Sequence, residues 1–509
     1  MLNKRKRILC KLTIIAVSMC VCGGCSGKNK KDNKEKANTT EAALIVSETG
    51  ETETNVEEKI ETDNKNLIFA DKYLNVSSTF AKVSKFYVYG THFNFEASVN
   101  NKELSKVLGG FNGKKGIKKV SLCLVDMEEC LNNENAFAEL KVEKSAVKKR
   151  VKGKFKIKGK KLKFKLAEKI NEGLFLEDIE NGNYAFFINV LDKNGNGVFI
   201  PLSNKTKEKN IEYYTITDLE KKTNNKIEIF SDKEVKKNRS INFMFLSCED
   251  SKLPDDVYDI VIDPGHGGDD VGAVRGHHYE KDLALEIATS VYEELLEKGY
   301  KVLITRDGTE TNEDYTVYTS YEKNGRVTLA CKSKAKYAIS IHLNSGNPDS
   351  DIGGVQVYCS GYASTRMGRA LAENIVNEAD SYYSVIGAFS RAPGVYSHTF
   401  GNAEMTEMKG IAAQYGFKPY DVKFGDDYLY MIRELGGMIT NAYTDGRHPL
   451  YGVNKYIDSN QGIECCLCEL AYMSSKSDFK HFLKHKKDYV RGVVKGITEN
   501  IDSDKQRNY

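Results

Sequence analysis

Residues 256–281 read DVYDIVIDPGHGGDDVGAVRGHHYEK, and this stretch decides the fold of the second half of the chain. Residues 257–262 form a largely apolar, β-branched run that predicts a buried strand. The proline that follows cannot continue a strand ladder, and the next glycines permit a tight turn. This turn presents His266 at a strand end, where α/β sheets bind ligands. Fourteen residues later Glu280 begins a helical pattern, so the two side chains can converge on one metal ion.

Strand and helix patterns alternate over the rest of this half of the chain. The predicted strands cover residues 301–305, 337–343, 354–359 and 465–470, and the predicted helices cover 280–299, 324–335, 363–379 and 478–501. The alternation predicts an α/β domain, residues 256–505, with a largely parallel sheet. Residues 381–462 exceed what such a domain needs, and we expect this insertion to shape or occlude the site.

A second histidine stands near the end of a predicted strand. The apolar run YAISIHL places His342 close to its carboxyl end. With His266 and Glu280 it makes two histidines and one carboxylate, a set that binds catalytic zinc and leaves a fourth position for water. Each residue alone is more often an ordinary polar group, but the combination favours a metal site. His277 and His278, in the loop before Glu280, are rival ligands or incidental.

A catalytic base is also needed, to take a proton from water. The run ECCLCEL, residues 464–470, offers Glu464 and Glu469. We prefer Glu469, because it lies at the carboxyl end of the predicted strand, where an α/β active site forms. Cys465 and Cys468 have CxxC spacing, but strand alternation points them to opposite faces, so we expect small buried residues rather than metal ligands.

Several short motifs occur together in this half of the chain. They are Ile262–Gly268, Tyr279–Leu283, Leu303–Arg306, Ser340–Ser345 and Cys468–Leu470, the last followed by Asp478. In this order, across residues 257–501, they resemble the zinc-dependent N-acetylmuramoyl-L-alanine amidases of the family-3 type, which cleave bacterial peptidoglycan. The sequence departs from that family at residues 470–472, where a Gly-Phe pair is usual, and at Leu343, where a small residue is usual.

The resemblance implies that His266, Glu280 and His342 bind Zn2+ and that Glu469 is the catalytic glutamate. It also implies a mixed α/β sheet and hydrolysis of the amide bond between N-acetylmuramic acid and L-alanine, for cell-wall remodelling or lysis. Peptidoglycan would then be the partner. Two alternatives stay open, namely another zinc peptidase that cuts the stem peptide, and a wall-binding lipoprotein without catalytic activity.

The first 25 residues carry the features of an export signal. Basic residues 4–7 precede a short apolar stretch, 12–24, which is too short to span a membrane comfortably. The stretch ends in VCGGCS, which resembles a bacterial lipobox with Cys25 as the lipidated residue, although Cys22 stands where Leu is usual. A plain signal peptide or an uncleaved anchor is the alternative. We expect an exported protein, anchored in the cell membrane through Cys25 and facing the cell wall.

Two further regions separate this signal from the α/β half. Residues 26–66 are charged, lack aromatic residues and predict a disordered tether. Residues 67–250 contain short alternating or β-branched runs between Asn/Gly turns, which predicts an all-β, sandwich-like domain with an immunoglobulin-like arrangement as an option. Residues 204–255 predict one more edge element and a linker. The role of this domain is open between a spacer and a wall-binding module.

Composition sets the outer limits. The 509 residues, 40% hydrophobic and 29% charged, suffice for two or three domains. A net charge of +4 is small for this length and predicts no nucleic-acid partner. Lysine is nevertheless dense in residues 148–165, where it alternates with apolar residues. This indicates the solvated face of an amphipathic hairpin, or alternatively a basic face for an anionic polymer. No pattern predicts the oligomeric state.

Overall fold

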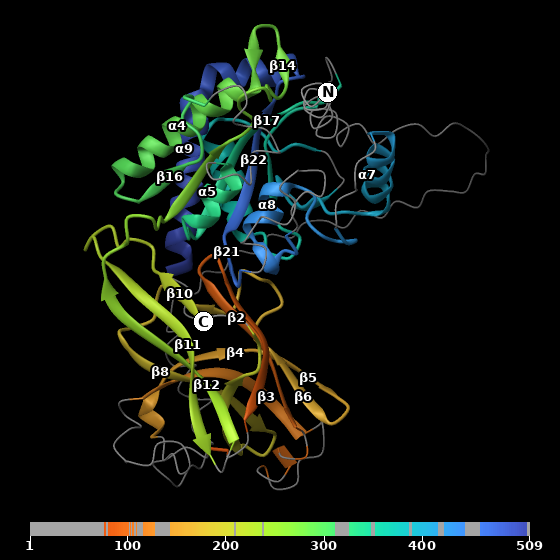
Figure 1. Ribbon diagram of the computed structural model, residues 1–509. Helices are drawn as coiled ribbons and strands as arrows, with labels where there is room; N and C mark the ends of the chain where they lie inside the picture. Colours follow the sequence, from red (N-terminus) through yellow and green to blue (C-terminus); the bar gives the residue numbers. More distant parts are fainter. Residues whose placement is uncertain are drawn as a thin grey trace, which may run out of the picture.

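The computed structural model describes residues 76–505 with gaps, and shows two parts stacked end to end (Figure 1). The gaps are residues 78–79, most of 101–115, 128–142, 208–209, 237–238, 311–324, 348–351, 386–388, 416–421 and 443–458. The predicted signal, Cys25 and the tether therefore lie outside the described residues. Among the helices that are described, none combines the length and the apolar composition needed to cross a membrane.

The β-rich part, residues 76–251, contains twelve of the labelled strands and one short 3-10 helix. They are β1 (Ala81–Tyr89), β2 (His92–Asn100), β3 (Ile117–Asp126), η2 (Lys144–Ala146), β4 (Val147–Lys152), β5 (Lys154–Lys158), β6 (Lys161–Lys165), β7 (Leu174–Phe175), β8 (Gly182–Asp192), β9 (Gly197–Asn204), β10 (Ile211–Tyr214), β11 (Asn224–Lys236) and β12 (Arg239–Ser251). Hydrogen bonds join these strands into one branched sheet, in the order β10-β11-β12-β8-β9-β1-β2-β6-β5, with β3 and β4 branching from β8. Apolar side chains from most of the strands meet in one core.

The described strands form one connected hydrogen-bonded network, in which β8 pairs with β3, β9 and β12, and the sandwich-like or immunoglobulin-like arrangement stays a prediction. One expectation for this part needs correction. Residues 204–255 are not an edge element followed by a linker, because β10, β11 and β12 occupy most of them. The strands β11 and β12 pair along thirteen residues each, and β12 continues the sheet by pairing with β8. The Lys- and Asn-rich composition of this stretch concealed the alternation of its strands.

The α/β part, residues 257–505, has a seven-stranded sheet with helices on both faces. Its elements are β13 (Ile260–Pro264), β14 (Val274–Arg275), β15 (His278–Tyr279), α4 (Glu280–Glu297), β16 (Val302–Ile304), α5 (Arg326–Lys332), β17 (Tyr337–Asn344), β18 (Gln356–Cys359), α6 (Arg366–Glu378), β19 (Ser390–Ala392), β20 (Val395–Tyr396), α7 (Asn402–Tyr415), α8 (Tyr430–Leu435), η4 (Gly437–Ile439), β21 (Gln461–Gly462), β22 (Glu464–Tyr472) and α9 (Lys476–Lys505). The sheet order is β16-β13-β17-β22-β18-β20-β19, and only the β18–β22 and β19–β20 pairs are antiparallel. The predicted alternation and the mixed, mostly parallel sheet are therefore confirmed.

Strand alternation divides the core of this sheet between two layers of helices. On β22, Cys466 and Cys468 face α4, α6 and α9, while Cys465 and Leu467 face α5 and α8. The prediction that the cysteines point to opposite faces and are buried is confirmed. Residues 381–462 supply β19, β20 and α8 to this core, so that segment builds part of the fold as well as any wall of the site.

The two parts join through hydrogen bonds at the amino ends of the parallel strands. The short strand β21 pairs in parallel with β1 of the β-rich part. Buried Asp259 of the α/β part accepts hydrogen bonds from Nα and Oγ1 of Thr217, at 3.0 and 2.8 Å. Nδ2 of Asn171 donates to Oε1 of Glu464 at 2.6 Å, and Oδ1 of Asn171 accepts from the amide of Ser364 at 2.7 Å. Since Asp259, Asn171 and Glu464 are buried, their pairing ties the two parts together.

Candidate metal centre and catalytic glutamate

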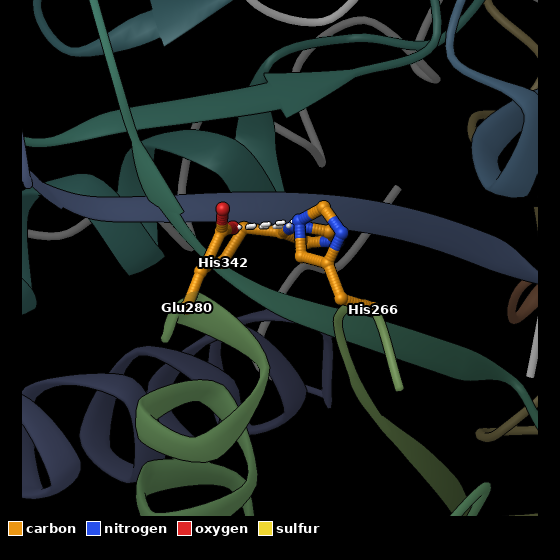
Figure 2. A group of neighbouring side chains, drawn as sticks. All are labelled: His266, Glu280 and His342. Carbon is orange, nitrogen blue, oxygen red and sulfur yellow. Dashed lines mark hydrogen bonds and ion pairs between the residues drawn. The ribbon is translucent and has the colours of Figure 1, made fainter. Parts of the chain in front are cut away.

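The three side chains predicted as metal ligands come together (Figure 2). His266 follows strand β13, Glu280 is the first residue of α4, and His342 lies near the carboxyl end of β17. One ligand atom from each lies within 4.8 Å of the other two. Nε2 of His266 lies 2.9 Å and Nδ1 of His342 lies 3.1 Å from Oε1 of Glu280. Among the described residues this is the one cluster of three or more such side chains with metal-binding spacing.

The contacts of these atoms fit a divalent metal. Nε2 of His266 is buried and, although close to Glu280, has no hydrogen bond of acceptable geometry within the described part of the chain. A buried ring nitrogen that lacks a hydrogen bond, close to a carboxylate oxygen, can take a metal ion as its partner. Two imidazoles and one carboxylate are a zinc donor set with room for a further ligand. The residues present therefore fit zinc.

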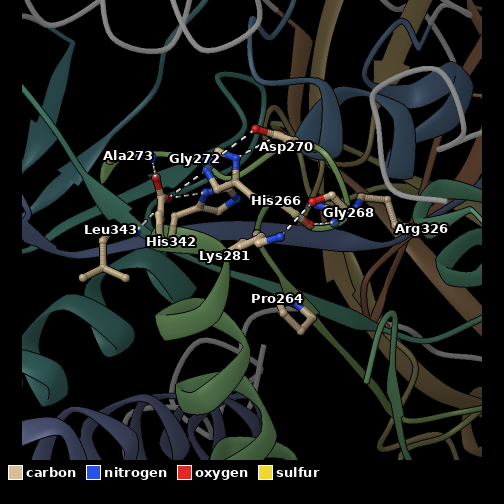
Figure 3. Close-up of polar contacts among 12 residues, drawn as sticks. Pro264, His266, Gly268, Asp270, Gly272, Ala273, Lys281, Arg326, His342 and Leu343 are labelled. Carbon is tan, nitrogen blue, oxygen red and sulfur yellow. Dashed lines mark hydrogen bonds and ion pairs between the residues drawn. The ribbon is translucent and has the colours of Figure 1, made fainter. Parts of the chain in front are cut away.

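A glycine-rich loop fixes the His266 ring and the Glu280 carboxylate (Figure 3). His266 has a left-handed backbone with φ +59°, which non-glycine residues adopt only under constraint. Its Nδ1 lies 2.9 Å from Oδ2 of Asp270, which orients the ring and leaves Nε2 toward Glu280. The backbone amides of Ala273 and Leu343 donate to the two oxygens of Glu280, at 2.8 and 3.0 Å. The sequence prediction missed Asp270, although an acidic residue four positions after a ligand histidine was a usable signal.

Gly272 shows why this loop needs small residues. Its φ is +66°, and a Cβ added there would lie 2.7 Å from Cβ of Glu280 and from Cδ2 of His266. A side chain at this position would therefore push the two ligands apart. Two arginines also hold this loop through its backbone carbonyls. Nη2 of Arg306 donates to the carbonyl of Gly265 at 2.8 Å, and Arg326 donates to the carbonyl of His266.

Burial and mutual contacts set the ionisation of the three ligands. Burial lowers the pKa of His266, but Glu280 and Asp270 outweigh it and raise that pKa to about 10. Burial raises the pKa of Glu280, but His266 and His342 outweigh it and hold this pKa well below its ordinary value. Burial also lowers the pKa of His342. The lowered pKa values favour an ionised Glu280 and a neutral His342, the forms that bind metal, whereas the raised pKa of His266 means that a metal competes with a proton there.

Glu469 lies next to this cluster, as predicted. It is in register with His342 on the neighbouring parallel strand, so the two side chains lie on the same face about 5 Å apart at Cβ. It is 7% exposed, and its Oε2 has no hydrogen-bond partner among the described residues. Burial, and then the charge of Glu280, raise the pKa of Glu469 well above its ordinary value. A buried carboxyl with a free oxygen beside a metal cluster can accept and return a proton.

The competing residues lie elsewhere. Glu464, the other candidate base, is at the opposite end of β22, where Asn171 holds it at the junction of the two parts. His277 and His278 lie around the β14–β15 hairpin, with their ring centroids 4.1 Å apart and the rings tilted by 37°, and neither belongs to the metal cluster. His278 instead packs against the ring of Phe479.

Comparison with known proteins agrees with this geometry. Residues 260–502 match the family described as N-acetylmuramoyl-L-alanine amidase. This region is a domain of that family. The amidase domain thus contains the whole seven-stranded sheet and all four residues of the candidate site.

Individual relatives of the amidase domain match shorter stretches. A germination-specific N-acetylmuramoyl-L-alanine amidase of Bacillus subtilis is 42% identical over 91 residues, which is 17% of this chain and 38% of that protein. The YqiI protein of the same organism is 28% identical over 170 residues, 33% of this chain and 75% of the relative. The AmiA amidase of Escherichia coli is 35% identical over 123 residues, 24% of this chain and 39% of the relative. The chain therefore spans less than half of the two relatives that are named as amidases.

Among solved structures, the CwlD amidase of Clostridioides difficile, in complex with the GerS lipoprotein, superposes with a TM-score of 0.32 at 19% identity. The match covers 48% of this chain and 99% of that one.

Proposed function

We propose that this protein is a zinc-dependent amidase that hydrolyses the bond between N-acetylmuramic acid and L-alanine in peptidoglycan. The observation that carries the proposal is the alignment of Glu469 with His342 beside the His266–Glu280–His342 cluster, inside an amidase-family domain. A metal-binding site without a base would support only binding, whereas this pairing supplies both parts of a hydrolytic site.

The chemistry divides between the cluster and the glutamate. A zinc ion held by His266, Glu280 and His342 would supply a Lewis acid for the amide carbonyl and lower the pKa of water. Glu469 accepts the proton of the attacking water through its unpaired Oε2 and passes it to the departing amine of L-alanine. Asp270 contacts Nδ1 of His266 and so orients the ring with Nε2 toward Glu280, where a zinc ion would be held. The carboxyl groups of Glu280 and Glu469 are both buried, which keeps bulk water away from this transfer.

We further propose where the enzyme acts. An export signal over residues 1–25, lipidation at Cys25 and a tether over residues 26–66 would hold the protein at the outer face of the cell membrane, facing the wall. The support is the sequence pattern of that segment. Residues 67–250 would be a separate β-rich domain that positions the amidase domain.

Digestion of purified sacculi tests the activity. The protein, with its zinc content measured, should release intact stem peptides that begin with a free L-alanine amine. It should leave glycan whose N-acetylmuramic acid carries a free lactyl carboxyl group. Glu469→Ala should reduce the rate of this release by at least about a hundredfold, since general acid–base catalysis contributes a rate factor of about 10²–10⁴. Zinc should stay bound in this variant.

The products separate the alternatives. Fragments cut within the stem would show another zinc peptidase. Binding to sacculi with no product, from a zinc-loaded protein, would show a wall-binding protein instead. Full activity in the Glu469→Ala variant would refute the role given to this residue.

A further inference from the structure

One segment of the chain carries a dense run of positive charge. Residues 148–165, KKRVKGKFKIKGKKLKFK, contain eleven Lys and Arg residues and no Asp or Glu. Because the whole chain has a net charge of +4, the remainder carries 4 − 11 = −7. This segment is therefore strongly basic, in a chain whose other residues are on balance acidic.

The pairing of β5 with β6 sorts these residues onto two faces. Phe155 pairs with Phe164 and Ile157 with Leu162, and these apolar pairs face the core of the β-rich part. The alternate pairs are all lysine against lysine, namely Lys154–Lys165, Lys156–Lys163 and Lys158–Lys161. The hairpin therefore presents a ladder of cross-strand lysine pairs on its outer face, and β5 forms the edge of the sheet (Figure 1).

Acidic partners balance the ladder only at its base. Lys154 lies 2.8 Å from Glu168, and Lys165 lies 3.8 Å from Glu96. The other four lysines, Lys156, Lys158, Lys161 and Lys163, are exposed, and no described acidic side chain lies within ion-pair distance of them. We call these four the lysine ribbon.

Cross-strand like charges destabilise a sheet, since directly opposite side chains lie about 4.5–5.5 Å apart at Cβ. The lysine ribbon contains two such directly opposed pairs, although Thr, Gln or Glu would also be compatible with these exposed strand positions. A cost of this kind is relieved when an anion lies between the paired ammonium groups, because it is then attracted to both.

We propose that the lysine ribbon is a binding surface for a linear polyanion that carries phosphate groups along its length. Successive lysine pairs on the ribbon are about 7 Å apart along the strands, which forms a straight double row. A row of this shape matches a chain of regularly spaced charges. The apolar side chains of the hairpin face inward, with Leu162 and Phe164 buried and Phe155 and Ile157 partly covered.

The same observation argues against a membrane as the partner. Peripheral membrane surfaces combine basic residues with exposed apolar side chains that enter the headgroup region. The tip of this hairpin is Lys158-Gly159-Lys160-Lys161, which offers no apolar side chain. Charge alone therefore carries recognition, as expected for a soluble or wall-linked polymer.

Binding of labelled linear inorganic polyphosphate to the full chain tests the proposal. The variant K156Q/K158Q/K161Q/K163Q removes the lysine ribbon, and K298Q/K480Q/K484Q/K487Q removes four exposed lysines of the α/β part as a charge-matched control. Loss of the ribbon should weaken binding at least tenfold at low salt. It should also reduce the slope of log affinity against log salt by about 3, at roughly 0.7 per lost contact. The control should bind nearly as the unaltered chain does.

Two further measurements complete the test. The midpoint temperature of thermal unfolding of the ribbon variant should be unchanged or higher, since repulsion between the lysines is removed. A variant in which the four lysines become arginine should fold and bind polyphosphate. Its failure to bind would contradict a purely ionic surface. Equal losses in the ribbon variant and the control would overturn the proposal, because net charge alone would then explain binding. Ribbon-dependent binding to phosphatidylglycerol vesicles without binding to polyphosphate would also overturn it, in favour of a membrane.

Discussion

Oδ2 of Asp270 lies 2.9 Å from Nδ1 of His266, on the side of the ring away from Glu280. The aspartate thus fixes the ring from behind while leaving Nε2 free to bind a metal. Asp270 lies in the same loop as His266 and belongs to no strand or helix, so the loop carries both the ligand and its support.

Asp270→Ala should lower the zinc affinity of the protein by about 10–100-fold, the usual cost of losing a partner that orients a ligand. Competition with a chromogenic chelator measures this directly. The neighbouring Asp269 is exposed, and Asp269→Ala is the matched control, with affinity expected to stay unchanged. Equal affinities for the two variants would show that Asp270 does not orient His266.

Gly265→Ala should displace a ligand without unfolding the protein. A Cβ at this position would lie 2.3–2.5 Å from three atoms of the His342 ring, while the glycine has an ordinary negative-φ backbone. The ring must move, so we expect a loss of zinc affinity at least as large as for Asp270→Ala, about 10–100-fold or more.

Gly410→Ala is the control for this substitution, since nothing lies within 4 Å of its added Cβ. Zinc stoichiometry and circular dichroism measure the two effects separately. Normal zinc binding by Gly265→Ala would contradict the close packing of this glycine against His342.

Asn171→Ala should loosen the junction between the two parts. It removes the donor to Oε1 of Glu464 and the acceptor for the amide of Ser364, in a place where Asn171 and Glu464 are buried. We expect a loss of about 1–3 kcal/mol in the free energy of unfolding, the cost of leaving buried polar groups unpaired.

Urea unfolding measures this loss. Asn181→Ala, which removes an exposed hydrogen bond to Asp250, is the control and should cost much less. Equal effects of the two substitutions would mean that the junction adds no stability beyond a surface contact.

Asp427 should make the stability of the protein depend on pH. Burial raises its pKa from 3.8 to about 6, against the hydrogen bonds from Ser360 and Gly361. A folded-state pKa above the unfolded one means that the native state binds the proton more tightly. Asp427 therefore contributes roughly 3 kcal/mol to the free energy of unfolding below about pH 4, and this contribution is lost as the pH rises through about 6.

The comparison is with Asp427→Asn, which has no proton to lose. The difference in unfolding free energy between this variant and the unaltered chain should shift in favour of the variant as pH rises from about 4 to about 7. Parallel stability profiles for the two proteins over this range would contradict the raised pKa.

The ligands of the metal cluster were predictable because local sequence fixes them. A proline and glycines after an apolar run end β13 at His266, and the helical pattern begins at Glu280. The position of Glu469 beside the cluster, with Glu464 at the other end of the strand, was predictable for a similar reason, since parallel strands present their carboxyl ends at one edge.

Contacts between distant segments were not predictable in this way. Asn171 and Glu464 are 293 residues apart in the sequence, and no spacing rule relates them. The connected sheet of the β-rich part depends on which of many similar short strands pair, and that choice is made by tertiary packing. The register that sets lysine against lysine in β5 and β6 likewise appears only once the hairpin is formed.

The parallel pairing of β1 with β21 also has a mechanical consequence. The amide of Val88 bonds to the carbonyl of Asn460 and the amide of Gly90 to that of Gly462, both at 2.9 Å, and β21 leads directly into the strand that carries Glu469. Suppose that the chain is anchored at its amino-terminal side and the amidase domain is bound to a polymer. Tension between these two points then pulls β1 and β21 along their length in opposite directions. Their hydrogen bonds then bear the load together in shear, and the joint should yield as one unit at a rate set by its unfolding barrier.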